Sequence, residues 1–173
     1  MHDGRAFRLW YDGLPISLLN PATDASGRTS DYVSLYNCHK AFVVCHVTQG
    51  SATPVEWSVL MATDDNGTNS AAVYNNVPIA ANENVGASDV IVDQAAGTSY
   101  TNTDTEETKL VIFEIEPTWA FNLNNLPTNS NALPFTHIAV QTAASSASNI
   151  TSAMLYLLPL RNSANPVPST TGV

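Results

Sequence analysis

The sequence is poor in charge, and especially in bases. Charged residues make up 12% of the 173 residues, with 6 Lys and Arg against 15 Asp and Glu, so the formal net charge is −9. Proteins that bind nucleic acid neutralise phosphates with clustered Lys and Arg. The six bases here are scattered along the chain, so we expect no nucleic-acid partner. The acidity favours solubility, and a basic partner surface is the alternative interpretation.

Cysteine is also scarce, with Cys38 and Cys45 as the two examples. In one continuous strand, residues seven apart lie about 23 Å from each other on opposite faces, so these thiols cannot pair. A histidine follows each cysteine, at His39 and His46, which raises the alternative of a zinc site. Structural zinc sites present ligand pairs about two to four residues apart at a turn, not dipeptides on a strand. We therefore predict two buried, reduced thiols and no metal or cofactor, in a protein made in a cytosol.

Long apolar runs are missing as well. Residues 1–20 contain no unbroken apolar stretch of the kind found in a secretory signal. No run approaches the roughly 18 apolar residues that a membrane helix needs. The sequence therefore predicts no membrane partner.

Strand patterns fill most of the chain instead. The longest run of β-branched and aromatic residues without proline spans residues 31–50. Within it, residues 41–47 are apolar on both faces except at His46, which predicts a central strand between two layers. Alternation and short apolar runs predict further strands within residues 53–63, 71–74, 77–79, 89–93, 109–117, 135–142 and 150–160.

Strands in this number, without a convincing amphipathic helix, predict an all-β protein with a single antiparallel β-sandwich, jelly-roll-like or immunoglobulin-like in topology. A chain of this length fits one domain, because a domain of about 150 residues buries roughly 70% of its unfolded surface. The residues predicted to be nearly fully buried are Phe42, Val43, Val44, Val59, Val111, Phe113, Ile138 and Leu157.

The two ends are expected to lie outside the sandwich, which we place at residues 30–162. Residues 1–29 form a predicted N-terminal arm, in which Pro15 and Pro21 prevent a helix. The arm is rich in large apolar side chains and must pack on its own domain or on a neighbouring subunit. Residues 163–173, rich in Asn, Ser, Pro and Thr, are expected to form a flexible tail.

Three groups of residues are candidates for a site, and each has a plainer interpretation. Residues 64–68 resemble a calcium loop but lack its ligand spacing, so a turn is favoured. Glu114 and Glu116 share one face of a strand, which suits a solvated strand edge better than a catalytic pair. Trp10, Trp57 and Trp119 are candidate sugar-binding aromatics, although Trp57 fits the core. We predict no catalytic, cofactor-binding or metal-binding residue.

Several segments together resemble a family of small virion proteins of tailed bacteriophages. The resemblance covers about 130 residues in the same order, and the order and spacing carry it. The segments are residues 27–37, the Val-rich strand that ends at Thr48-Gln49-Gly50, the Trp57 strand that runs into residues 61–64, residues 109–116, residues 135–140 and residues 155–161. The chain departs from the family pattern in a long insertion over residues 69–107 and in its Pro-rich tail.

The resemblance implies a non-enzymatic structural protein of the virion, made in the cytoplasm of a bacterial host. Its implied role is capsid decoration, with the major capsid protein as partner and a homo-oligomer, trimer or dimer, as the working form. The alternatives are a neck, tail or fibre component of the virion, or a carbohydrate-binding β-sandwich module.

Overall fold

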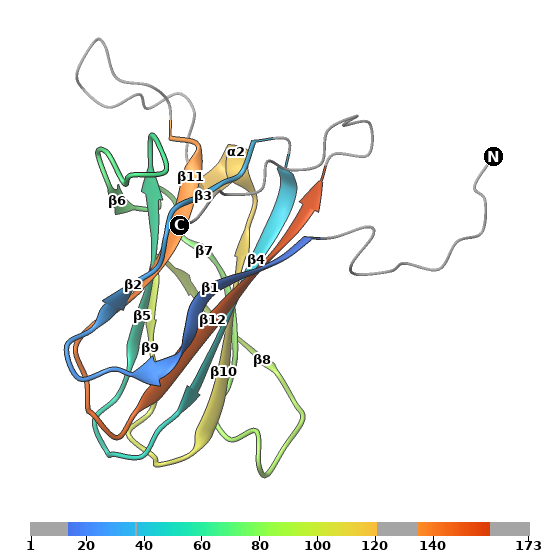
Figure 1. Cartoon of the computed structure of the whole chain (residues 1–173). Coiled ribbons are helices and arrows are strands. Elements are labelled where there is room, and N and C mark those ends of the chain that lie inside the picture. The colour runs from blue at the N-terminus through green and yellow to red at the C-terminus, as the bar shows by residue number, and fades with distance from the viewer. Residues whose placement is uncertain (1–13, 37, 121–134, 160–173) are drawn as a thin grey trace.

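Two antiparallel β-sheets pack face to face in this computed structural model, which describes residues 14–36, 38–120 and 135–159 (Figure 1). Sheet A contains, in spatial order, β1 (Leu14–Thr23), β12 (Ile150–Pro159), β4 (Cys38–Thr48), β10 (Thr108–Ile115), β7 (Val77–Asn82) and β8 (Val92–Gly97). Sheet B contains β2 (Arg28–Thr29), β11 (His137–Thr142), β5 (Glu56–Ala62) and β6 (Ala71–Ala72), with β3 (Val33–Ser34) paired to β11 and β9 (Ser99–Thr101) paired to β5. One helical turn, α2 (Pro117–Ala120), follows β10. The prediction of an all-β sandwich is confirmed.

The strand order is that of a jelly roll. Successive strands alternate between the sheets, first through β1, β2 with β3, β4 and β5, and again through β9, β10, β11 and β12. The resulting orders, β1-β12-β4-β10 and β2-β11-β5-β9, form the two interleaved four-stranded sheets of this architecture. The β7–β8 hairpin is inserted between β5 and β9, within residues 69–107, and extends sheet A beyond β10 (Figure 1).

The core lies between the sheets and follows the period-two pattern of the strands. On β10, Val111, Phe113 and Ile115 are fully buried, and on β5 the same holds for Trp57 and Val59. The predicted core residues that are confirmed as fully buried are Val43, Val59, Val111, Phe113, Ile138 and Leu157.

The prediction that Phe42 and Val44 are fully buried is wrong. β4 is central within its sheet, between β12 and β10, but sheet B covers only the face that carries Ala41, Val43 and Cys45. Phe42 and Val44 point to the opposite face, where they are half-buried. Being central in a sheet is therefore not the same as lying between two layers.

A β-bulge in β4 also corrects the prediction for the cysteines. Leu158 is opposite Lys40 and Pro159 is opposite Cys38, so β4 carries one extra residue, His39, at this point. The bulge resets the alternation, and Cys38 and Cys45 both face inward rather than to opposite sides. Both thiols are free and buried. Residues 31–50, predicted to form one long strand or two short collinear ones, are instead divided between the sheets, with β3 in sheet B and β4 in sheet A.

Of the two alternatives for the predicted arm, residues 1–29, the structure shows packing on its own domain for residues 14–23. β1 is a ten-residue edge strand of sheet A, with Leu14 opposite Leu157 and Thr23 opposite Ile150. An edge strand tolerates Pro15 and Pro21, because a missing N–H on its free side costs no ladder hydrogen bond. Residues 1–13 and the predicted tail, residues 163–173, lie outside the described residues.

We predict that Phe113→Ala lowers the free energy of unfolding by about 3–5 kcal/mol, because it leaves a cavity in the fully buried core. Phe42→Ala, on the half-buried face of the neighbouring strand, is the matched control and should cost less. Urea denaturation of both variants measures the difference. Equal costs would contradict the assignment of the two faces.

Neither thiol should react in the folded protein. Burial raises the pKa of the Cys38 thiol to about 11 and also raises the pKa of Cys45. The thiolate is the reactive form, so a thiol reagent at neutral pH should label neither cysteine until denaturant is added, and then both without reductant. Rapid labelling of the native protein would show that the bulge at His39 is misplaced.

Candidate interaction surfaces

The outer face of sheet A, turned away from sheet B, is apolar over its three central strands. We call its half-buried and exposed side chains the outer patch, which consists of Phe42, Val44, Leu110, Ile112, Met154, Tyr156 and Leu158. The ladders place these residues in rows across β12, β4 and β10. Val44 lies opposite both Met154 and Ile112, and Phe42 lies opposite Tyr156. Met154 remains 39% exposed.

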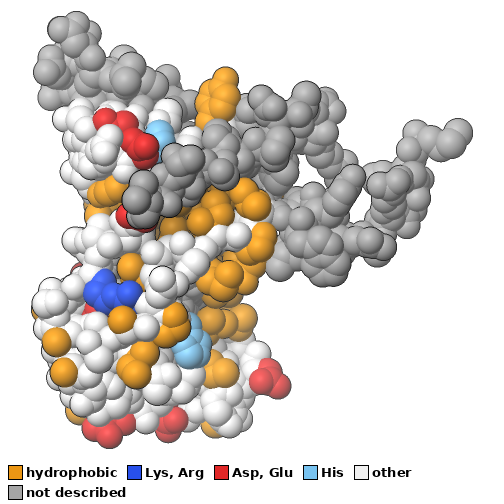
Figure 2. All heavy atoms as spheres, in the orientation of Figure 1, with side chains coloured by type: hydrophobic (Ala, Val, Ile, Leu, Met, Phe, Trp, Pro, Cys, Tyr) orange, Lys and Arg blue, Asp and Glu red, His pale blue; other side chains and the backbone are white. Residues whose placement is uncertain are grey.

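Figure 2 shows hydrophobic side chains gathered over the part of the molecule where Figure 1 draws β1, β12 and β4. Few charged groups interrupt the outer patch. Lys40 pairs with Glu114 at one end of it, and His46 is exposed toward the other. Contiguous apolar surface with a polar border is characteristic of protein interaction sites.

The pairing of Glu114 with Lys40 revises the prediction for Glu114 and Glu116, of which Glu114 alone lies in β10. A solvated strand edge was expected, but β10 has β4 on one side and β7 on the other. Glu114 is half-buried beside Lys40, whereas Glu116 is exposed. The two carboxylates thus have separate surroundings.

A second surface is the free end of sheet A at β8. Val90, Ile91 and Val92 are three consecutive apolar residues that are 63%, 45% and 53% exposed. Asp89 and Asp93, both exposed, flank them. The hairpin that carries them also frames an open hollow, lined by Ala81, Asn82, Glu83, Asn84, Ala87, Ser88, Val90, Val92 and Gln94.

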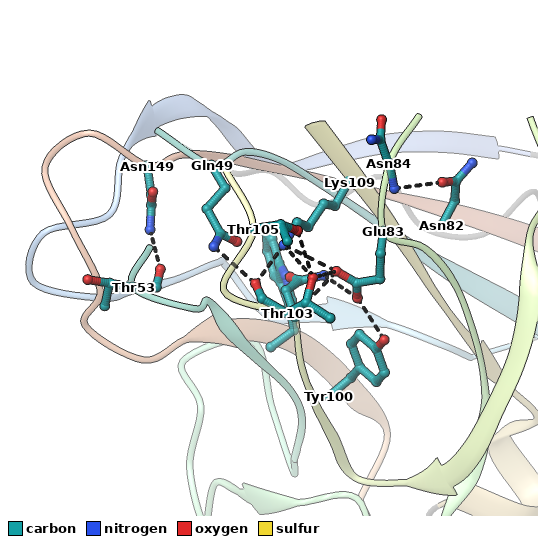
Figure 3. Close-up of polar contacts among 12 residues, drawn as sticks. Gln49, Thr53, Asn82, Glu83, Asn84, Tyr100, Thr103, Thr105, Lys109 and Asn149 are labelled. Atoms are coloured by element: carbon teal, nitrogen blue, oxygen red, sulfur yellow. Dashed lines mark hydrogen bonds and ion pairs between the residues drawn. The ribbon is translucent and has the colours of Figure 1, made fainter. Parts of the chain in front are cut away.

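A polar network anchors the start of the loop that joins β7 to β8 (Figure 3). Glu83, directly after β7, accepts hydrogen bonds from Tyr100 Oη at 2.7 Å and from Asn102 Nδ2 at 3.0 Å. Its second carboxylate oxygen accepts from the Thr103 backbone N–H at 3.1 Å and hydroxyl at 2.9 Å. Asn102 in turn accepts from the buried Trp57 indole at 2.9 Å. The network therefore ties the end of β7 in sheet A to the β9 segment of sheet B.

Lys109 is the cation of this network, and it is fully buried. Its Nζ lies 3.3 Å from Glu83 Oε2 and donates to the Thr103 carbonyl at 2.6 Å and hydroxyl at 2.8 Å. The Gln49 amide also donates to the Thr103 carbonyl, at 3.0 Å. A buried ammonium group needs partners of this kind, because an unpaired charge is costly to desolvate.

The pKa values of the network follow from its hydrogen bonds. Burial opposes the charged form of Glu83, but donors from Tyr100, Asn102 and Thr103 outweigh it and hold the pKa of Glu83 below its usual range. Burial and the neighbouring carboxylate of Glu83 raise the pKa of Tyr100. At neutral pH the network therefore holds an ionised glutamate and a neutral tyrosine.

The segment from Asp64 to Thr68 forms a turn, in agreement with the plainer interpretation. Asp64 Oδ1 accepts the backbone N–H groups of Asn66 at 3.1 Å and Thr68 at 2.9 Å. Hydrogen bonds from Thr68 lower the pKa of Asp64, a group at the surface. Gly67 has a positive φ and abuts the ring of Tyr32, so a larger residue would not fit. Within residues 14–36, 38–120 and 135–159, no group of three or more His, Cys, Asp or Glu could hold a metal ion.

Of the three tryptophans, Trp57 is confirmed as a core residue. Trp119 lies in α2, and Trp10 lies outside the described residues. Among the helices of the described chain, none is long and apolar enough to cross a membrane.

Comparison with known proteins gives little to build on. No protein-family model matches the chain, and no curated protein matches it. A crystal structure of the SPBc2 prophage-derived protein YomS is similar to this chain at 12% sequence identity, over 84% of this chain and 93% of that chain, with a TM-score of 0.46. This likeness is too weak to assign a family or a function.

The Glu83 network predicts a specific pH dependence of stability. A depressed carboxyl pKa stabilises the fold above the unfolded value, about 4.3, and that stability is lost as the pH falls through the folded value. Glu83→Gln should therefore be less stable than the wild type at neutral pH, and the difference should shrink below about pH 4. Glu106→Gln, an exposed acid in the loop that carries Thr103, is the control. Thermal melts from neutral to acidic pH give the comparison, and a constant difference would contradict it.

Proposed function

We propose that this chain is a non-enzymatic structural protein of a tailed-phage virion, a decoration protein that binds the lattice of the major capsid protein. The outer patch on β12, β4 and β10 is the observation that carries the proposal. A sandwich that has already filled the space between its sheets has no need for apolar residues on an outer face, unless a partner covers them.

The resemblance of the sequence to small virion proteins supplies the setting for this surface. Its segments include most of β4, β5, β10 and β11 and half of β12. The jelly roll itself does not decide the function, since this architecture also serves lectins and enzymes. What separates a binding module from an enzyme is the site, and the described surface offers flat apolar area rather than a convergent set of reactive groups.

The outer patch suits a broad protein surface better than a sugar. Sugar-binding modules present exposed aromatic rings, whereas Trp57 is buried and donates its indole N–H to Asn102. A flat apolar face can instead stabilise a protein contact by about 1.5–3 kcal/mol for each large side chain that becomes fully buried. A neck or tail position in the same virion would use the same face, so location must be tested on the particle.

The test is binding to particles assembled from the major capsid protein of the genome that encodes this chain. Wild-type protein should saturate the particles, and cryo-electron microscopy should show it on the lattice with the outer patch facing the capsid. The double variant Val44→Lys, Met154→Lys should raise the dissociation constant at least about tenfold, equivalent to about 1.4 kcal/mol.

The matched control is Tyr74→Lys, which places a lysine at a 50% exposed residue that follows β6 in sheet B. It should bind as the wild type does. Unchanged binding by the double variant would rule out the outer patch as the contact. Density at the neck or tail alone would replace decoration with the alternative position, and the absence of any binding would overturn the virion proposal.

A further inference from the structure

The two edges of sheet A are protected very differently. β1, at one edge, contains Pro15 and Pro21, and its register with β12 shifts twice, between Ser17 and Leu19 and between Leu19 and Ala22. Prolines and bulges of this kind are the means by which proteins prevent edge strands from pairing with other chains. The β1 edge is therefore closed to further strands.

β8, at the other edge, has fewer of these features. Within the described residues it pairs with β7 alone, and its sequence, Val92–Gly97, contains no proline and no lysine. Its register with β7 shifts once, where β8 has one extra residue between Gln94 and Gly97. With Val90 and Ile91 exposed directly before it, β8 is the less protected of the two edges, and another strand covering it would remove the exposed apolar surface.

Charge indicates which strand could cover the β8 edge. The acidic residues Asp89 and Asp93 flank the exposed apolar residues, so a second β8 would bring like charges together. The complementary strand must be apolar and carry basic residues. The chain has such a segment in residues 5–11, where Arg5 and Arg8 accompany Phe7, Leu9, Trp10 and Tyr11.

The length of the connecting chain decides which copy supplies the strand that pairs with β8. Residues 1–13 precede β1, at the edge of sheet A opposite β8. A strand added beyond β8 lies six strand spacings from β1, or about 29 Å. Residues 12 and 13 bridge the gap from Tyr11 to Leu14 by at most about 10 Å. The segment of the same molecule cannot reach its own β8.

We propose that residues 5–11 of one copy add a strand to β8 of a second copy, which brings the bases Arg5 and Arg8 near the acids Asp89 and Asp93. Each copy then donates a strand from beside the β1 edge of its sheet A and accepts a strand from another copy at its β8 edge. Such a head-to-tail contact is heterologous, so it closes into a ring when the rotation between copies allows. The contact forms between copies alone, and its measurement in solution needs no capsid particle.

A charge swap in the full-length protein tests the proposal, with native mass spectrometry as the readout of assembly. The wild type should form a closed oligomer. Arg5→Glu with Arg8→Glu should raise the dissociation constant by about tenfold or more, and Asp89→Arg with Asp93→Arg should do the same. The variant that combines all four changes should regain the oligomer, a rescue that no general loss of stability can produce.

Two controls accompany the swap. Asp104→Arg with Glu106→Arg changes the same charge in an exposed loop next to the network and should leave the oligomer intact. Hydrogen exchange should show protected amides over residues 92–97 in the wild type and lose that protection in the Arg5→Glu, Arg8→Glu variant. A monomeric wild type, an oligomer that survives either reversal, or a combined variant without rescue would each overturn the proposal.

Discussion

Sheet B can cover only one face of sheet A, and the surface chemistry of this protein depends on that constraint. The covered face is filled by Ala41, Val43 and Cys45 of β4 and by their neighbours on β10 and β12. The same strands carry Phe42, Val44 and Ile112 on the other side, where no second sheet lies within the described part of the chain. The proposed protein contact would supply a second layer on this face.

The ion pair of the fully buried Lys109 with the half-buried Glu83 anchors the inserted hairpin. The insertion leaves sheet A after β8, crosses to sheet B at β9 and returns to sheet A at β10. At this crossing Glu83, Thr103 and Lys109 hold three separate segments with short hydrogen bonds. For the proposed addition of a partner strand to β8, this anchoring would reduce the entropy that binding has to overcome.

The sequence pattern predicted the sandwich and most of its core because period-two alternation reports burial directly. It misassigned Phe42 and Val44, since alternation cannot show whether one or two layers cover a strand. It missed the bulge at His39, which depends on the register with β12. The burial of Lys109 was missed too. Lys109 lies on the same face of β10 as Val111, Phe113 and Ile115, and this alternation could have predicted its burial. The β8 edge had no sequence signature, because an edge is defined by the strands that are absent beside it.

The jelly-roll order also governs when the protein can fold during synthesis. The central strand β4 has β10 on one side and β12 on the other, and β1 pairs with β12, the last strand of the described chain. On the ribosome, the strands that precede β10 thus emerge before the neighbours that complete sheet A. Contacts between strands so distant in sequence form slowly. Before β10 and β12 have been synthesised, the low charge density of the chain and the Val-rich sequence of β4 make the nascent chain most prone to aggregation.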